Sequence, residues 1–382
     1  MDKETWVLWY RLTQIPGLGN ISSNRLLDSF GNAENIFNAS LDDLVAVPGI
    51  SERIAENILS SDLNPDSKDI CEEWELVLKH NVQIISRFDE GYPPLLKEIY
   101  DPPILLYVKG RIKKKDMISV GMVGTRKATQ YGKSVAESLS ADLANTGITI
   151  ISGLARGIDT ASHKGALRAN GRTIAVLGNG LDNYYPQENK TLQANDIPEN
   201  GAVVSEFPMK YGSLPENFPR RNRIISGMSL GLIVVEAPLK SGALITARNA
   251  LEQNREVYAV PGRITDATAG GTNMLIKQGA QPVTNAEDVF EDLKQKIQKY
   301  MAQIGYNEDI PGIIHKEPEI DKTSWSDEEQ LIYNILGDES VHIDMICRKS
   351  GLEAAKISRI LCNLELKGII SRSSGMYFAR VA

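Results

Sequence analysis

Residues 147–180, GITIISGLARGIDTASHKGALRANGRTIAVLGNG, contain one full repeat of the pattern that decides the fold. An apolar run is followed by a glycine-rich loop, a helical segment that ends near Gly171, and a second apolar run. Short apolar runs separated by helices indicate parallel strands that are covered on both faces. The same alternation continues from about residue 117 to residue 290. We therefore expect a doubly wound, extended Rossmann-like α/β sheet.

Glycines, hydroxyl groups and arginines follow the ends of these apolar runs. The segments are GTR at 124–126, SGLARGID at 152–159, SEFP at 205–208 and SGAL at 241–244. In an open parallel sheet the carboxyl ends of the strands meet at one edge, where ligands bind. Helix N-termini favour anions there, and arginine side chains form two hydrogen bonds to phosphate. This edge is therefore predicted to bind phosphate groups.

A second cluster, FPRRNRIISG at residues 218–227, places three arginines in four positions beside an aromatic ring. Guanidinium groups can hold a phosphate chain while an aromatic face stacks on an unpaired base. The alternative is a capped amphipathic helix with solvated arginines. Because this cluster occurs together with the loops that are predicted to bind phosphate, we favour a site for single-stranded DNA over this alternative. The candidate DNA-binding residues are Gly124, Thr125, Arg126, Ser152, Gly153, Arg156, Phe218, Arg220, Asn222, Arg223, Ser241, Gly242 and Thr246.

Three enzyme-like patterns are incomplete. Gly132-Lys133-Ser134 resembles the end of a P-loop, but Lys127 occupies the position of the first glycine. The dinucleotide motif GxGxxG lacks its third glycine. Ser152, Asp159 and His163 lack the GxSxG elbow of a hydrolase triad, and His163 is expected on a helix surface. No catalytic residue and no cofactor is predicted.

The amino-acid composition limits the classes of protein to which the chain can belong. The net charge of −7 is unevenly distributed, because residues 1–80 carry 6 basic and 14 acidic side chains while residues 111–290 carry 21 and 16. A basic patch in the middle of the chain is compatible with an acidic whole. Three cysteines without CxxC pairs and four dispersed histidines indicate a reducing compartment and no metal site. No apolar run is long enough to span a membrane, so a cytoplasmic protein is expected.

Changes in pattern along the chain predict four parts. Residues 1–80 are predicted to form a helical domain of the SAM or helix-hairpin-helix type, and residues 81–300 the Rossmann-like DNA-binding domain, with connector strands at 81–116. Residues 301–324 are polar and predict a linker. Residues 325–382 contain three helical stretches and a hairpin, which is typical of a winged-helix domain.

The helical domain contains two similar turns, Ile15-Pro16-Gly17-Leu18-Gly19 and Val47-Pro48-Gly49-Ile50, each followed by a helical segment. Such turns present the free N–H groups of the next helix to a phosphate. Because this part is strongly acidic, we favour a helical bundle that makes no DNA contact. For the near-neutral winged-helix-like part, protein contact is favoured over DNA contact.

Taken together, these motifs resemble the DNA-processing protein A family, DprA, also called Smf. The resemblance covers most of residues 115–285, with the order and spacing of the motifs kept. The motifs are GTR at 124, SGLARGID at 152, TIAVLGNGLDNYYP at 173, SEFP at 205, FPRRNRIISG at 218, SGALITA at 241, AVPG at 259 and GTNMLIKQGA at 271.

The resemblance implies a recombination mediator rather than an enzyme. Members of this family bind incoming single-stranded DNA during natural transformation, protect it and help to load the RecA recombinase. They form homodimers through the Rossmann-like domain. The family's basic pocket includes the arginine of GTR, which is Arg126 here, and arginines that match Arg220 and Arg223.

Two other classes remain open. A nucleoside-phosphate hydrolase of the lysine-decarboxylase-like class would share the phosphate-binding edge, but its PGGxGTxxE signature is missing. Val260-Pro261-Gly262-Arg263 begins like that signature, and Gly270-Gly271-Thr272 follows without the glutamate. The third class is an adaptor that contacts other proteins through its end domains.

Overall fold

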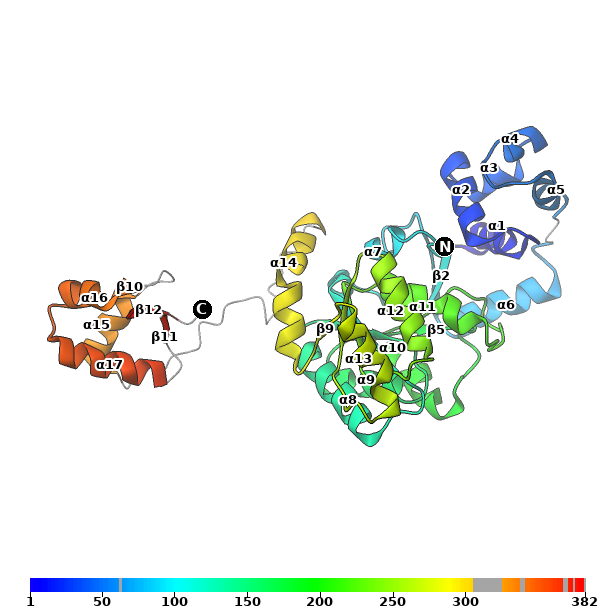
Figure 1. Ribbon diagram of the computed structural model, residues 1–382. Coiled ribbons are helices and arrows are strands. Elements are labelled where there is room, and N and C mark those ends of the chain that lie inside the picture. The colour runs from blue at the N-terminus through cyan, green and yellow to red at the C-terminus, as the bar shows by residue number, and fades with distance from the viewer. Residues whose placement is uncertain (62–63, 305–324, 337–340, 367–369, 374, 381–382) are drawn as a thin grey trace. The chain divides into compact units, whose positions relative to one another are not determined.

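The computed structural model describes residues 1–61, 64–304, 325–336, 341–366, 370–373 and 375–380. These residues belong to two compact units, residues 1–311 and 312–382, which are described separately (Figure 1). The predicted linker at 301–324 begins inside helix α14 (Ala286–Ile304), and the rest of it lies outside the described residues.

The first unit is built on a nine-stranded sheet with the order β1-β2-β6-β5-β4-β3-β7-β8-β9. From β6 to β9 all neighbouring strands are parallel, as predicted. The two connector strands extend this sheet, because β2 pairs antiparallel with β6 and β1 with β2. The strands are β1 (Val82–Ser86), β2 (Leu105–Gly110), β3 (Ser119–Val123), β4 (Thr149–Ser152), β5 (Thr173–Leu177), β6 (Gly201–Ser205), β7 (Gly231–Val234), β8 (Glu256–Ala259) and β9 (Gln281–Pro282).

Every residue of β3, β4, β5, β6 and β7 is buried, which explains their continuous apolar runs. The helices connected to these strands are α7 (Pro94–Lys97), α8 (Gln130–Asn145), α9 (Ile158–Arg168), α10 (Ile197–Asn200), α11 (Asn217–Gly227), α12 (Gly242–Glu252), α13 (Gly270–Lys277) and α14. Shorter turns of helix are η1 (Lys114–Met117), η2 (Gln187–Asn189), η3 (Leu192–Asp196) and η4 (Ala267–Ala269).

The strand order creates a switch point between β3 and β7. From β3 the chain passes through α8 to β4 on one side, and from β7 it passes through α12 to β8 on the other. The loops after β3 and β7 therefore diverge and leave a crevice at the carboxyl ends of the strands. Figure 1 shows α11 and α12 close together over the sheet.

Six helices precede the sheet: α1 (Lys3–Gln14), α2 (Asn20–Phe30), α3 (Ala33–Phe37), α4 (Leu41–Val45), α5 (Glu52–Ser60) and α6 (Lys68–Lys79). The two predicted turns precede α2 and α5, and both contain a glycine in the left-handed region, Gly17 with φ +82° and Gly49 with φ +88°.

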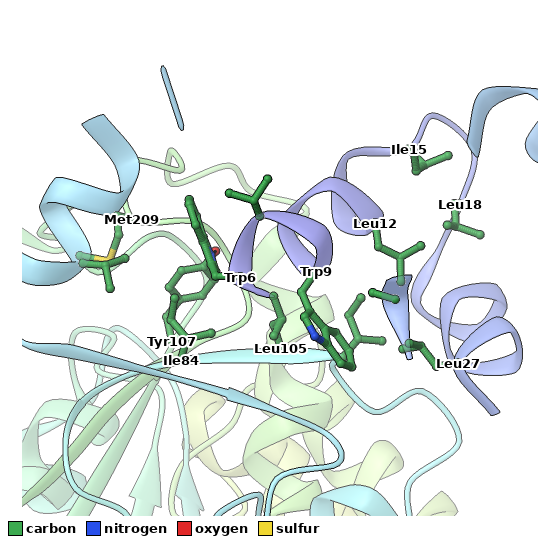
Figure 2. Close-up of a cluster of buried hydrophobic side chains, with 14 of the residues drawn as sticks. Trp6, Trp9, Leu12, Ile15, Leu18, Leu27, Ile84, Leu105, Tyr107 and Met209 are labelled. Atoms are coloured by element: carbon green, nitrogen blue, oxygen red, sulfur yellow. The ribbon is translucent and has the colours of Figure 1, made fainter. Parts of the chain in front are cut away.

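The helical part and the sheet share one hydrophobic core. Trp6 of α1 is fully buried and its Nε1 donates a hydrogen bond to the Tyr107 hydroxyl on β2, at 3.1 Å. Figure 2 shows this ring beside Tyr107, Ile84 and Met209 of the sheet domain, with Leu12 and Leu27 continuing the core among the helices. This shared core explains why residues 1–80 and the sheet form one compact unit.

The second unit consists of helices α15 (Asp327–Ile335), α16 (Ile343–Ser350) and α17 (Ala354–Leu366), with strands β10 (Val341–His342), β11 (Ile370–Ser373) and β12 (Tyr377–Arg380). The strands form an antiparallel sheet in the order β10-β12-β11. Ile332, Ile357, Leu361, Leu364 and Phe378 are buried between the helices and the sheet. The three helices and the hairpin confirm the winged-helix prediction.

Candidate nucleic-acid interface

A cavity of about 350 Å³ lies at the switch point, between the loops that follow β3 and β7 and the first turn of α11. Such a crevice is the usual ligand site of an open α/β sheet. Eight of the sequence-predicted residues line the cavity: Gly124, Thr125, Arg126, Phe218, Asn222, Ser241, Gly242 and Thr246. The structure thus brings together residues that lie as far as 122 positions apart in the sequence.

Arg126 and Phe218 form the aromatic and cationic wall of the cavity. The guanidinium carbon of Arg126 lies 4.9 Å from the centre of the Phe218 ring, and Tyr185 packs against that ring at 5.5 Å. Arg126 and Lys240 are both exposed and line the cavity. Neither makes an ion pair with any residue that the structure describes. Both charges are therefore available to a phosphate.

A buried pair, Arg221 and Asp159, forms the floor. The Arg221 guanidinium donates hydrogen bonds to the carbonyls of Gly153 (2.7 Å) and Val176. Burial lowers the pKa of Arg221 to about 10, and the Asp159 charge partly opposes that shift. Burial also raises the pKa of Asp159 to about 6, against the opposing effect of Arg221. At neutral pH the floor combines a buried cation with an ionised carboxylate.

The N-terminus of α12 at the cavity is suited to an anion. Helix α12 has no acidic residue in its first turn, and Ser241 caps it by accepting a hydrogen bond from the Ala243 N–H at 3.2 Å, whereas the N-cap of α11 is Glu216. By contrast, the Glu236 carboxylate already occupies the N-terminus of α8, where it accepts from the Thr129 N–H at 2.9 Å. The P-loop-like Gly132 lies within α8 against Glu236, so this segment forms no phosphate loop.

Five of the predicted residues do not line the cavity, and three of them belong to the loop after β4. Ser152 is fully buried and its hydroxyl donates to the Met122 carbonyl at 2.6 Å. A side chain at Gly153 would collide with Arg221, so this glycine makes room for the buried arginine rather than for a ligand. Arg156 is exposed but forms a two-pronged ion pair with Glu188, at 2.6 and 2.8 Å.

Arg220 and Arg223 point away from the switch-point cavity toward a buried carboxylate. Arg223 is only 9% exposed and its Nη2 donates to Glu206 at 2.6 Å, while its Nε donates to Asp101 at 3.1 Å. Arg220 is more exposed and also reaches Glu206, at 3.3 Å. The segment 218–227 is an α-helix, and its arginines divide between two sides of it.

The residues considered for a hydrolase triad, Ser152, Asp159 and His163, do not have the geometry of one. The expected surface position of His163 is wrong, because the side chain is fully buried and its Nδ1 lies 2.7 Å from the Thr173 hydroxyl. Burial lowers the pKa of His163 to about 3, so the ring is neutral. Asp159 interacts with the Ala155 N–H and Arg221, and Ser152 with a strand carbonyl.

Sequence reasoning missed three functional candidates in this cavity: Asp159, Lys240 and Arg221. Lys240 directly precedes the SGAL segment and could have been found from its place after β7. Arg221 stands between two other arginines, and no sequence signal separates the buried member of that run from the exposed ones.

The described residues contain no helix with the length and apolar character needed to cross a bilayer. Within the same residues, no group of three or more histidine, cysteine or acidic side chains is arranged to hold a metal ion. A Rossmann-like sheet with a cationic and aromatic cavity at its switch point, joined to helix-hairpin-helix and winged-helix elements, defines an α/β protein of the nucleic-acid-binding class.

The chain belongs to the family described as DNA recombination-mediator protein A, whose match covers residues 83–294. The DprA winged helix domain matches residues 316–376, and a SAM-like helix-hairpin-helix tandem matches residues 10–61. These matches confirm the resemblance that the sequence motifs indicated.

Similar proteins and structures match between 58% and 97% of the chain. Protein Smf of Escherichia coli is 36% identical over 97% of this chain and 94% of its own length. The DNA processing protein DprA of Bacillus subtilis is 47% identical over 58% of this chain and 75% of its own length. The X-ray structure of DprA from Streptococcus pneumoniae matches 74% of this chain and 96% of that chain, with a TM-score of 0.65 and 36% identity.

Proposed function

We propose that this protein binds single-stranded DNA in the switch-point cavity and acts there as a recombination mediator without catalysis. The observation that carries the proposal is the pairing of Arg126 with Phe218 at the cavity wall, 4.9 Å apart. A cation beside an aromatic face suits the two parts of a nucleotide, since the guanidinium takes the phosphate and the ring stacks on the base.

The preference for single strands follows from the aromatic contact. Only an unpaired base can leave its neighbours and stack on Phe218, whereas a duplex offers phosphates alone. Lys240 and the N-terminus of α12 add further phosphate contacts. Affinity should fall with salt by roughly 0.7 logarithmic units per neutralised phosphate for each tenfold rise in salt concentration.

The decisive test is the substitution Arg126→Glu. The side chain is exposed and makes no ion pair among the described residues, so the variant should keep the wild-type unfolding midpoint. It should lose at least tenfold in affinity for fluorescent oligothymidine, because one favourable phosphate contact becomes a repulsive one. The matched control is Arg168→Glu on the far end of α9, which should bind normally. Wild-type affinity in Arg126→Glu would place the site elsewhere.

We further propose that the protein works as a homodimer in the cytoplasm. Large apolar side chains that are 43–63% exposed line one surface cavity of the sheet domain: Leu239, Ile245 and Leu251. A cluster of exposed apolar side chains is typical of a protein–protein contact. Leu251→Asp should convert the dimer to a monomer, as measured by light scattering at micromolar concentration.

Delivery of the strand to RecA is the remaining part of the proposal. A mediator that holds the strand by a few contacts can release it to a filament that covers the whole backbone. RecA filament formation on oligothymidine coated with single-strand-binding protein should be faster with the wild type than with Arg126→Glu. Chromatography should show no base released from nucleoside monophosphates, in contrast to a nucleoside-phosphate hydrolase.

A further inference from the structure

A pocket of about 250 Å³ lies at the amino-terminal edge of the sheet, opposite the switch-point cavity. Met117 and Met228 line this pocket and lie just before the starts of β3 and β7, whereas the switch-point cavity lies beyond the ends of the same two strands. The pocket and the cavity have no lining residue in common. A molecule in the pocket can therefore be bound at the same time as DNA at the switch point.

The lining of the pocket is mainly apolar. Its mouth is marked by apolar side chains that are only half-buried, Pro94, Ile112 and Met117. The two methionines are unbranched and can adapt to the shape of a bound group. At about 250 Å³ the pocket is smaller than the usual site of a drug-sized ligand, and it suits one or two apolar side chains of a protein.

A basic segment borders the pocket. Lys113 and Lys114 line it, and Arg111 and Lys115 flank them, so that four cations occupy five positions. All four side chains are exposed, and none forms an ion pair with a residue that the structure describes. The Lys113 N–H donates to the Asp116 carboxylate at 2.7 Å, which holds the segment beside the pocket.

Two carboxyl groups also line the pocket, but positive charge exceeds negative charge there. Asp116 is 3% exposed, and its Oδ2 accepts from Nη2 of Arg172 at 2.7 Å, so its charge is compensated. Glu90 is exposed and faces the four cations of the basic segment as a single negative charge. The mouth of the pocket therefore attracts acidic groups.

We propose that this pocket is a docking site for a protein partner with a short acidic segment that carries one or two large apolar side chains. The apolar side chains enter the pocket, and the neighbouring aspartates or glutamates contact Lys113 and Lys114. A nucleic acid fits this surface less well, because its phosphates would contact the lysines while the apolar lining stayed in water. The inference goes beyond the proposed function, since it concerns the opposite edge of the sheet.

The test uses five fluorescein-labelled peptides, each with four acidic residues followed by glycine and two copies of leucine, isoleucine, methionine, phenylalanine or tryptophan. Their binding is measured by fluorescence anisotropy with the full-length protein saturated with oligothymidine, so that an acidic peptide cannot occupy the switch-point cavity. At least one peptide should bind. Its affinity should fall at least roughly tenfold when serines replace its two apolar residues, or when amides replace its carboxylates.

The pocket can be filled without disturbing the fold. Gly91 is exposed and lines the pocket, and a Cβ added there would meet only the Ile85 side chain, at 3.9 Å. Gly91→Trp should weaken peptide binding at least roughly tenfold, because the new ring takes the place of the apolar anchor. Gly212→Trp is the matched control, since Gly212 is exposed, lies outside the pocket and has no atom within 4 Å of an added Cβ.

A charge reversal tests the basic segment separately. The double variant Lys113→Glu and Lys114→Glu should lose at least roughly tenfold in peptide affinity and keep its affinity for oligothymidine. The control is Lys164→Glu with Arg168→Glu, which changes the net charge equally on exposed positions of α9 and should bind the peptide normally.

Three results would overturn the inference. The first is that none of the five peptides binds, or that binding is equal in Gly91→Trp and Gly212→Trp. The second is that reversal of Lys113 and Lys114 weakens oligothymidine binding instead, which would assign the segment to nucleic acid. The third is that Gly91→Trp changes the oligomeric state in light scattering, which would assign the pocket to a second copy of the chain.

Failure of the wild type to bind oligothymidine would instead refute the proposed function. The peptide measurement would then be made without oligothymidine, and the comparison of Gly91→Trp with Gly212→Trp would still decide the docking site, because neither residue lines the switch-point cavity.

Discussion

Asp159 is a carboxyl group whose protonation is coupled to folding. Burial raises its pKa from 3.8 to about 6, so between these pH values the unfolded chain releases a proton that the folded chain retains. Stability from this group is therefore lost as the pH rises from about 4 to 6. The asparagine of the Asp159→Asn variant cannot ionise. The free energy of unfolding of this variant, relative to that of the wild type, should therefore increase by about 2 kcal/mol between pH 4.5 and pH 7.5.

Urea unfolding of both proteins at the two pH values measures this difference. His163 acts in the opposite direction, because its pKa is lowered to about 3 and stability is lost as the pH falls below its ordinary value of 6.5. It is present in both proteins and cancels in the comparison. A stability difference that does not change with pH would show that Arg221 keeps Asp159 ionised in the folded state.

At the scale of single elements, the loop after β4 supports the loop after β3. Gly157 has φ +80°, and a Cβ there would collide with the Thr125 carbonyl oxygen and lie 2.9 Å from that of Arg126. Gly157→Ala should therefore displace Arg126 and weaken oligothymidine binding by at least roughly tenfold, in addition to a backbone cost of about 1–3 kcal/mol.

Gly31 provides a control with a similar positive φ, +81°, and a Cβ added there would meet no atom within 4 Å. Gly31→Ala should show the backbone cost in urea unfolding with no change in affinity. Equal affinities in the two variants would contradict the proposed contact between the two loops.

The elements were predictable to different degrees, for physical reasons. Strand β4 is buried on both faces, which explains the short and mostly apolar run ITII at residues 148–151 from which the strand could be predicted. The position of Arg126 at the carboxyl edge of the sheet could be predicted because the residue directly follows the apolar run of β3. Arg223 differs, because its partners Asp101 and Glu206 are 122 and 17 positions away and no local pattern reports them. His163 was misplaced because a histidine next to Lys164 in a helical segment looks like a surface residue, and no local pattern reports its buried contact with Thr173.

At the scale of the whole molecule, the helical part and the sheet should unfold together, since they share a core across α1 and β2 (Figure 2). Trp6→Ala removes a fully buried ring and the donor to Tyr107, at a cost of about 3–5 kcal/mol. In calorimetry of the full chain, residues 1–304 should unfold in a single peak, and its midpoint temperature should fall by roughly 5–10 °C.

The winged-helix unit should give a separate transition that Trp6→Ala leaves unchanged, because the two units have independent cores. Ile357→Ala identifies that transition, since this side chain is fully buried in the second unit and its loss should lower only that peak. A Trp6→Ala thermogram in which a new low-temperature peak appears while the sheet transition keeps its midpoint would show that the helices fold independently.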